Sequence, residues 1–566
     1  MATLLIFSVA FYAVAAEKFT LTVLHTNDIH SHFVESNPAG GRCYPSEKDK
    51  CVGGVARIAA QVKKFRSNPK KNVLFLNAGD VFQGTYWYNV HKHNVVSAVV
   101  SGLKYNATCL GNHEFDDRPA GLAPFLKDMQ VAQIPVLASN IDTSKAEEMK
   151  GLTPNKSIVL TVGGKTIGII GAVTREAMTS SKPAPVNITD ETASIKQEAA
   201  MLKEQGVNIL IALTHIGYTL EVNMTRDIPD IDIWVGGHTH SFLYTGNDYP
   251  KENVPVGDYP TVVNRTDGST GLVVQAYWFG KFLGHIEVTF DEKGQVTEWK
   301  GKPILMSQGI KEDPEMVKIL EPFKAAVENI TKAHVGRSLA YLDAADKVCR
   351  VEECNLGNCI TDSFFYYYAT RLPVSDRRKS WSQVNGAITN GGSIRASIDN
   401  IDDLIREDIL TTLPFCSRIL VLNITGKGLK DMFEHSMSQY DRAFRAAPFF
   451  QVSGMKLVFE PSASKGNRVK SFQILCTECR VPRYEPLNVS RTYKIVINEY
   501  ILHRLNSTLG DETQTVCEPE PKGCEVFEDY IRQKSPIICR VEGRMKFYNS
   551  TTKKATQASP GCPMLR

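Results

Sequence analysis

Apolar runs that end close to metal-binding residue types recur through the first half of this chain, and they constrain its fold strongly. The runs at 19–24, 73–76, 209–213 and 231–235 are each followed within a few residues by Asp or His. Such runs are typical of buried parallel strands and their exit loops. Because ligands of open α/β sheets gather beyond the carboxyl ends of the strands, we expect seven side chains to converge on one edge of one sheet. They are Asp28, His30, Asp80, Asn112, His215, His238 and His240.

These seven side chains offer oxygen and nitrogen donors without a cysteine. Closed structural zinc sites are usually rich in sulfur, so the mixture favours a catalytic site for divalent ions. The set is large enough for two ions with Asp80 as the bridge, an arrangement that can clamp a phosphate. Zinc is the first choice, with manganese, magnesium and calcium as alternatives. A single histidine of this kind would more often be an ordinary core or surface residue.

The stretch Leu110–Asp116 supplies a further pair of candidates behind Gly111, a glycine that permits a sharp backbone turn. His113 and Asp116 are three residues apart, which lets the carboxylate hold the imidazole in one tautomer. His113 is therefore a candidate catalytic residue that would stabilise charge on the phosphoryl or leaving oxygen. Asp116 is the candidate that would orient the His113 imidazole. The plainer alternative is that Asp116 only caps a helix.

The length of 566 residues predicts more than one domain. Alternating strand and helix patterns indicate an α/β domain over residues 17–310, and the runs at 273–276 and 285–290 look like later strands that close a second sheet. Residues 311–335 contain an amphipathic helix that suits a linker between domains. A second domain is expected over 336–548, followed by a flexible tail at 549–566. The net charge of +4 is too small for a chain of this size to indicate a nucleic acid partner.

Residues 1–16 form an apolar run that ends in small residues, which predicts a signal peptide. A lipid-anchor signal needs a hydrophobic tail at the C-terminus, and the C-terminal residues here are polar. We therefore expect a secreted protein without a membrane anchor. Ten Asn-x-Ser/Thr sequons predict glycosylation.

Thirteen cysteines also suit secretion. Four close pairs suggest disulfides, namely Cys43/Cys51, Cys349/Cys354, Cys476/Cys479 and Cys517/Cys524. Because the count is odd, at least one thiol is expected to be free or to pair between chains, and Cys109 is the candidate for a buried free thiol.

The second domain carries candidates for substrate contacts. Residues 390–395 form a glycine-rich loop that includes Asn390, Gly392 and Arg395, and backbone N–H groups with a guanidinium suit an anionic ligand. Arg350 lies beside Cys349, where a disulfide would fix it. Phe415 and Tyr500 are aromatic residues that could stack on a base. Each signal has a plainer alternative, since Gly-Gly turns are common and aromatic side chains are more often core.

Taken together, these segments resemble the 5′-nucleotidase/apyrase family of metallophosphoesterases over residues 19–548. The resemblance is carried by the motifs at 26–30, 77–80, 110–116, 214–215, 237–240, 355–358 and 390–395. It implies an N-terminal four-layer αββα metallophosphatase domain, a linker helix and a C-terminal α+β nucleotide-binding domain that rotates against the first.

The resemblance also assigns roles to residues. One metal ion would take Asp28, His30, Asp80 and His240, and the other Asp80, Asn112, His215 and His238. His113 and Asp116 would be the catalytic dyad. Phosphate contacts would come from the loop at 390–395 and from Arg350, and the base would lie between Phe415 and Tyr500.

The chain departs from the family at two places. The short glycine-rich turn with a ribose-binding Asp is replaced by the longer stretch 501–511, where Asp511 could substitute and Asn506 is a sequon. Ala387 stands where relatives often have a cysteine, so Cys359 needs another partner, for which Cys416 is the candidate.

The resemblance implies a nucleotide as substrate. The first choice is an apyrase that hydrolyses ATP and ADP to AMP and phosphate. The alternative within the family is a 5′-nucleotidase that converts AMP to adenosine. An alternative from another class is a secreted nucleotide-binding protein with weak turnover, although such a protein has no need of the His113–Asp116 pair.

Overall fold

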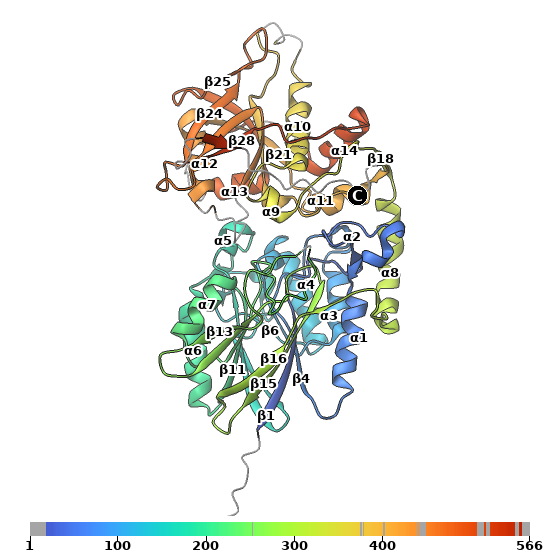
Figure 1. Ribbon diagram of the computed structural model, residues 1–566, viewed down its shortest axis with the longest axis vertical. Coiled ribbons are helices and arrows are strands. Elements are labelled where there is room, and N and C mark those ends of the chain that lie inside the picture. Colours follow the sequence, from blue (N-terminus) through green and yellow to red (C-terminus); the bar gives the residue numbers. More distant parts are fainter. Residues whose placement is uncertain are drawn as a thin grey trace, which may run out of the picture.

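The computed structural model consists of two domains stacked along its long axis (Figure 1). The structure describes residues 18–556 apart from 252, 374–375, 377–378, 400–401, 439, 441–448, 507–513, 517–520 and 550–553. The predicted signal peptide at 1–16 and Asp511 therefore lie outside the described residues. In the part of the chain that is described, no helix has the length and apolar character needed to cross a membrane.

The N-terminal domain contains two large sheets. The first has the order β16-β15-β1-β4-β5-β6, with β17 pairing β15. Its strands are β1 (Phe19–Thr26), β4 (Asn72–Asn77), β5 (Ala107–Cys109), β6 (Val136–Leu137), β15 (Phe282–Phe290), β16 (Val296–Gly301) and β17 (Ile304–Leu305). The second has the order β13-β14-β12-β11-β9-β8. Its strands are β8 (Ser157–Val162), β9 (Lys165–Val173), β11 (Ile209–His215), β12 (Ile233–Val235), β13 (Thr261–Asn264) and β14 (Thr270–Val274).

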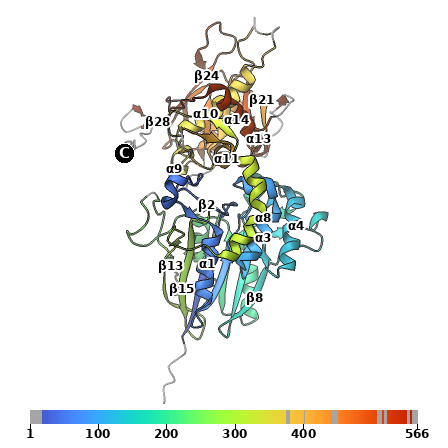
Figure 2. The same ribbon diagram turned by 90° about the vertical axis from the view of Figure 1, so that its right-hand side faces the viewer.

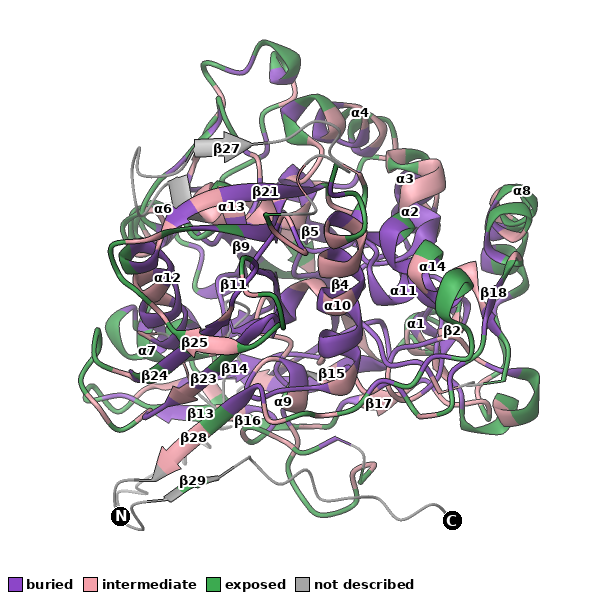
Figure 3. Ribbon diagram, turned by 90° about the horizontal axis from the view of Figure 1, so that it is seen from above, coloured by how far each residue is buried: buried purple, intermediate pink, exposed green. Residues whose placement is uncertain are grey.

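Helices cover the outer face of each sheet, which makes four layers. The first sheet is covered by α1 (Val55–Arg66), α2 (Tyr86–His91), α3 (His93–Leu103) and α4 (Arg118–Val131), and the second by α6 (Glu191–Glu204) and α7 (Tyr218–Asp227). Leu74 and Leu76 of β4 face the core between the sheets, whereas Phe75 faces the helices. Both faces of the central strands are thus buried, which explains their continuous apolar runs (Figure 3).

Two expectations about the sheets were wrong. The strands that lead to the seven candidate ligands belong to two sheets and not to one, since β1, β4 and β5 lie in the first and β11 and β12 in the second. Strand β15 was expected to close a second sheet but pairs antiparallel with β1 in the first. Strands buried on both faces carry no alternation that would tell two packed sheets from one.

Helix α8 (Pro314–Thr331) connects the two domains and packs against α1, α2 and α3. Asp313 caps it by accepting a hydrogen bond from the Met316 backbone at 3.0 Å. Met316, Leu320 and Val327 are buried in the same core as the helices of the first layer. Figure 2 shows α8 running along the side of the N-terminal domain toward the C-terminal domain.

The C-terminal domain is built on two five-stranded sheets. One has the order β22-β19-β26-β21-β27 and the other β25-β24-β23-β28-β29. The strands are β19 (Gly386–Asn390), β21 (Ile419–Thr425), β22 (Phe450–Ser453), β23 (Met455–Phe459), β24 (Val469–Leu475), β25 (Tyr484–Pro486), β26 (Thr492–Asn498), β27 (Gln514–Val516), β28 (Met545–Asn549) and β29 (Lys554–Thr556). The main helices are α10 (Asn355–Ala369), α11 (Arg406–Thr412), α12 (Gly426–Ser438), α13 (Glu499–Asn506) and α14 (Gly523–Lys534).

The other strands and α-helices of the described residues are short. They are β2 (Glu35–Ser36), β3 (Val52–Gly53), β7 (Ile141–Asp142), β10 (Asn187–Ile188), β18 (His334–Gly336), β20 (Leu404–Ile405), α5 (Ala177–Ser180) and α9 (Asp346–Cys349).

The disulfides confirm part of the cysteine assignment. Cys43–Cys51, Cys349–Cys354 and Cys476–Cys479 form as expected, and Cys109 is a buried free thiol. The pairs Cys517/Cys524 and Cys359/Cys416 were wrong, because the structure contains Cys359–Cys539 and Cys416–Cys524. These partners are 180 and 108 residues apart, and spacing cannot reveal such long-range pairs.

The Cys416–Cys524 disulfide closes a long loop, so its removal is expected to destabilise the C-terminal domain. The double variant C416S/C524S should lower the free energy of unfolding by about 2–5 kcal/mol. C476S/C479S is the matched control, because it opens a loop of only 3 residues and should cost less. Denaturant unfolding of both variants is the measurement, and equal losses would contradict the loop-length argument.

Candidate active site

The seven candidate ligands follow the carboxyl ends of five strands, on the side of the N-terminal domain that faces the C-terminal domain (Figure 1). Five of them have a positive φ angle, a conformation that is uncommon outside glycine. They are Asp28, His30, Asp80, His238 and His240, with φ between 49° and 78°. Backbone strain of this kind clusters at functional sites, where surrounding structure holds it in place.

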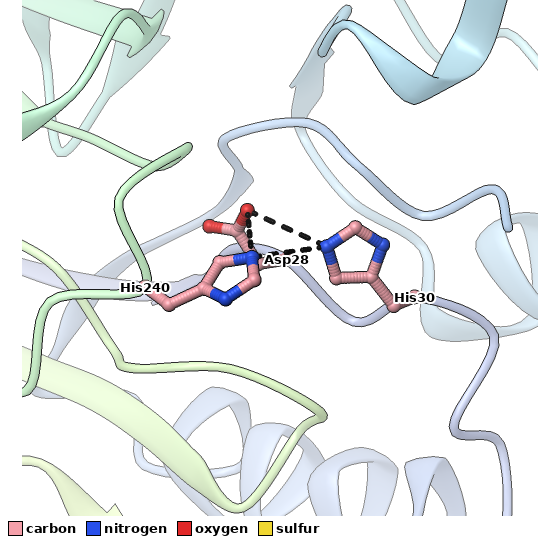
Figure 4. Close-up of side chains that lie close together, drawn as sticks. All are labelled: Asp28, His30 and His240. Atoms are coloured by element: carbon pink, nitrogen blue, oxygen red, sulfur yellow. Dashed lines mark hydrogen bonds and ion pairs between the residues drawn. The ribbon is translucent and has the colours of Figure 1, made fainter. Parts of the chain in front are cut away.

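Asp28, His30 and His240 form the first group of candidate metal ligands (Figure 4). His240 Nε2 lies 3.2 Å from Asp28 Oδ1 and 3.1 Å from His30 Nε2, and His30 Nε2 lies 3.8 Å from Asp28 Oδ1. One carboxylate oxygen and two ring nitrogens thus point at a common position, as ligands of one divalent ion would.

Asp80 lies between this group and a second group of candidate ligands, which consists of Asn112, His215 and His238. Its Oδ2 is 3.7 Å from His30 Nε2 on one side and 3.0 Å from His215 Nε2 on the other. The ring centroids of His215 and His238 are 5.2 Å apart. On its other side, His238 Nδ1 lies 3.0 Å from Asn112 Oδ1. All seven predicted residues are therefore brought together.

The hydrogen bonds of the histidines test whether these residues fit metal ions. His215 Nδ1–H donates to the Ala78 carbonyl at 2.7 Å, and His30 Nδ1–H donates to the Gln83 carbonyl at 3.1 Å. Each bond leaves the Nε2 lone pair facing the carboxylates, which is the form that coordinates metals. His215 Nε2 is buried and makes no hydrogen bond. The residues present therefore fit divalent ions.

Electrostatics around the groups agree with that fit. Burial, reinforced by Arg395, lowers the pKa of His30 well below its ordinary value, so its ring stays neutral. Burial alone would raise the pKa of Asp28, but the neighbouring His240 and His215 outweigh it and lower the pKa. A neutral His30 beside an ionised Asp28 is the ligand state that metal binding requires. Burial alone would lower the pKa of His215, but the Asp80 and Asp28 carboxylates outweigh it and raise the pKa to about 10. The carboxylates thus stabilise a positive charge at this place, which a bound cation would supply in place of the proton.

Glu114 was not assigned a role from the sequence, yet it holds two of the ligand loops together. Its buried carboxylate accepts hydrogen bonds from the backbone N–H groups of Asp80, Val81, Phe82 and Gly111 at 2.6–3.0 Å. Gly111 lets the backbone approach the Asp80 carboxylate closely, because a Cβ at this position would overlap that carboxylate. It is not needed for a turn with positive φ. The position of Glu114 inside the Leu110–Asp116 motif was the sequence signal that could have indicated its role.

His113 and Asp116 are in contact as expected. His113 Nδ1 lies 2.6 Å from Asp116 Oδ2, and the His113 backbone N–H donates to Asp80 Oδ1 at 2.9 Å. Burial alone would lower the pKa of His113, but the Asp116 and Asp80 carboxylates outweigh it and raise the pKa. The imidazole is thus oriented and favoured in its charged form.

A cavity of about 550 Å³ lies above the two groups and is lined by both domains. It is lined by all the predicted site residues except Asp28, His30 and His215. From the C-terminal domain it includes Arg350, Asn390, Gly392, Arg395, Phe415 and Tyr500. The Phe415 ring stacks on His113 with centroids 5.5 Å apart, and the Arg395 guanidinium lies 5.7 Å from the Phe415 centroid. The volume is typical of a small-molecule site.

Two further residues were missed from the sequence, namely Glu176, which lines this cavity, and Arg504, which pairs with Glu176. Glu176 follows the end of β9 by three residues and contacts His238, so the strand-end rule could have found it. Arg504 lies on α13, which occupies the start of the stretch where the chain departs from the family. No local signal marked Arg504, because its partner Glu176 belongs to the other domain.

Comparison with known proteins agrees with this architecture. Residues 21–242 match the model of the calcineurin-like phosphoesterases, and residues 330–507 match that of the 5′-nucleotidase C-terminal domain. The human 5′-nucleotidase is 36% identical, with 96% of this chain and 94% of the relative covered. The snake venom 5′-nucleotidase of Crotalus adamanteus is 37% identical, with 96% and 91% covered.

A solved structure gives the same result. The 5′-nucleotidase precursor of Thermus thermophilus is 33% identical, has a TM-score of 0.84, and is matched over 94% of this chain and all of its own. The two-domain fold, the family models and the relatives over nearly the full length lead to one conclusion. The chain belongs to the 5′-nucleotidase family of metallophosphoesterases, which are metal-dependent nucleotide phosphohydrolases.

Proposed function

We propose that this protein hydrolyses nucleoside 5′-monophosphates, with AMP as the first candidate, to the nucleoside and phosphate. The observation that supports this most is the single cavity that joins both candidate metal groups to Phe415 and Tyr500. A phosphate at the metal groups and a base against the aromatic side chains would belong to one bound nucleotide. The relatives compared above bear the name 5′-nucleotidase, which supports the same choice.

Seven residues would hold two divalent ions. Asp28, His30, Asp80 and His240 would hold one, and Asp80, Asn112, His215 and His238 the other. When bound, such ions polarise phosphoryl oxygens and lower the pKa of water. Zinc is the proposed metal, because the donors combine imidazole nitrogens with carboxylate and amide oxygens and include no thiolate.

The other residues would bind and orient the substrate. Arg350 and Arg395 would hold the phosphate from the C-terminal domain, since guanidinium groups pair well with phosphate oxygens. The His113 imidazole, held by Asp116, would donate a hydrogen bond to a phosphoryl or leaving oxygen. Phe415 and Tyr500 would stack on the base. Because residues of both domains line the cavity, product release would need the domains to separate.

Hydrolysis of ATP and ADP is the second candidate, and one observation favours it. Lys182, Arg418 and Lys522 line the cavity in addition to Arg350 and Arg395. Additional cations suit a substrate with more than one phosphate. The two candidates share the metal groups and differ only in how far the substrate extends from them.

Phosphate release from purified protein given AMP, ADP or ATP, with and without a chelator, tests the proposal. We expect release from AMP that the chelator abolishes. Release from ATP and ADP but not AMP would establish the second candidate. Tight nucleotide binding without release of phosphate from any of them would support a nucleotide-binding protein and overturn the proposed activity.

We also propose that the protein is secreted. The five disulfides among the described residues suit an oxidising compartment. The relatives include snake venom proteins. Detection of the protein in the medium of expressing cells, without residues 1–16, is the expected result.

A further inference from the structure

A chain of side-chain contacts runs from the C-terminal domain to the candidate metal ligand His238. On α13, Arg504 Nη1 lies 3.0 Å from the phenol oxygen of Tyr500 and 3.3 Å from Glu176 Oε1. Glu176 belongs to the N-terminal domain, and its Oε2 lies 3.3 Å from His238 Nε2. Arg504 thus contacts a proposed base-stacking residue and the carboxylate behind a proposed metal ligand.

Both ring nitrogens of His238 face an acceptor, Nε2 the carboxylate of Glu176 and Nδ1 the amide oxygen of Asn112, and the charged acceptor favours the proton on Nε2. A carboxylate accepts a hydrogen bond, so the contact places the proton on Nε2 and leaves a lone pair on Nδ1. That lone pair faces Asn112 Oδ1, which is also an acceptor, at 3.0 Å. Two acceptors at this separation repel each other unless a cation lies between or beside them. The contact therefore prepares His238 for a metal ion.

Arg504 in turn holds Glu176 in place. The Glu176 side chain is 42% exposed, whereas that of Arg504 is only 16% exposed. A surface carboxylate with no partner besides an imidazole would be free to turn toward water, and the guanidinium opposes this. Other contacts join the same segments, because His503 Nε2 donates to the Ser181 carbonyl at 3.1 Å and Lys182 pairs with Glu499 at 3.2 Å.

We propose that Glu176 and Arg504 are positioning residues that make the retention of a metal ion at His238 depend on the closed arrangement of the two domains. The Arg504–Glu176 contact exists only while α13 lies against the N-terminal domain, so domain opening removes it. A nucleotide that bridges the domains would favour closure and hence metal retention. By linkage, the metal ion would strengthen nucleotide binding by the same factor.

This inference rests on the proposed two-metal site, and metal release tests it without relying on activity. The full-length, zinc-loaded protein is mixed with a chromophoric chelator, with and without a phosphonate analogue of AMP whose carbon–phosphorus bond cannot be hydrolysed. The wild-type protein should release the more weakly held zinc ion more slowly when the analogue is bound.

Glu176→Ala should release this ion about 10- to 100-fold faster than wild type, as expected when the partner of a ligating histidine is lost. Glu176→Gln should release the ion at a rate closer to that of wild type, because the Gln amide oxygen still accepts a hydrogen bond from His238 Nε2–H. A thermal unfolding curve of each variant separates these effects from loss of fold. Release from Glu176→Ala at the wild-type rate would overturn the role of Glu176.

Arg504→Met should lose most of the slowing effect of the analogue. The matched control is Arg42→Met, because Arg42 also pairs across the domains, with Asp408 at 3.4 Å, and contacts no candidate ligand. Arg42→Met should keep the slowing effect. Equal behaviour of the two arginine variants would overturn the coupling through Arg504. A wild-type protein that binds no zinc would instead overturn the proposed two-metal function.

Discussion

Asp80→Asn is expected to lower kcat by roughly 1000-fold or more and to reduce the amount of bound metal. The Asp80 carboxylate is buried and lies between the two groups of candidate ligands, 3.0 Å from His215 Nε2 and 3.7 Å from His30 Nε2. Asn has nearly the same shape but lacks the charge that a bridging ligand supplies. Bound ions contribute several kcal/mol to such reactions, and each 1.4 kcal/mol is a factor of about ten in rate.

The measurements are kcat for the preferred nucleotide and the metal content of the purified variant. Asp232→Asn is the matched control, because Asp232 is also buried but lies directly before β12, where it accepts from the backbone N–H of Leu210 in β11, away from the ligands. This control should keep its metal content. If Asp80→Asn kept two ions and near wild-type kcat, Asp80 would not be the bridge.

His113→Ala is expected to lower kcat by about 100- to 10000-fold while changing KM little. A ring nitrogen of His113 lies within 4.8 Å of the Asp80 carboxylate, and Asp116 holds the ring at 2.6 Å in one orientation. A residue that stabilises charge mainly in the transition state affects kcat and kcat/KM alike. The size of the loss is typical for a positioned acid or charge-stabilising group. Steady-state kinetics with AMP, ADP and ATP is the measurement.

Two further variants make this result specific. Asp116→Asn should cause a smaller loss of kcat than His113→Ala, because the imidazole remains and only its orientation and charge are weakened. His91→Ala is the matched control, since His91 Nε2 bonds to the Phe323 carbonyl on α8 at 2.8 Å, away from the cavity. A large increase in KM with unchanged kcat for His113→Ala would assign His113 to substrate binding alone.

Much of the candidate site could be predicted from the sequence because its residues follow strand ends. His215 is the last residue of β11, and Asp80 follows β4 by three positions, so local patterns are sufficient to find them. The strand patterns alone could not show which strands share a sheet, since β4 has apolar residues toward both the neighbouring sheet and the helices. The four-layer arrangement followed only from the family resemblance. The pattern of strands buried on both faces is the same for one sheet or two.

Features that depend on distant contacts were also beyond the sequence. Cys416 pairs with Cys524 across 108 residues. Arg504 meets Glu176 only because the domains approach each other, and both residues look like ordinary surface charges in the chain. Such contacts are products of tertiary structure, and no period or spacing in the sequence encodes them.

The measurement that tests the central claim most directly is a metal titration of activity. The protein is stripped with a chelator and zinc is added back in fractions of one equivalent, while phosphate release from AMP, ADP and ATP is recorded. The two-metal account predicts negligible release without metal and a steep rise between the first and second equivalents. Full activity in the stripped protein, or saturation at one equivalent, would contradict it.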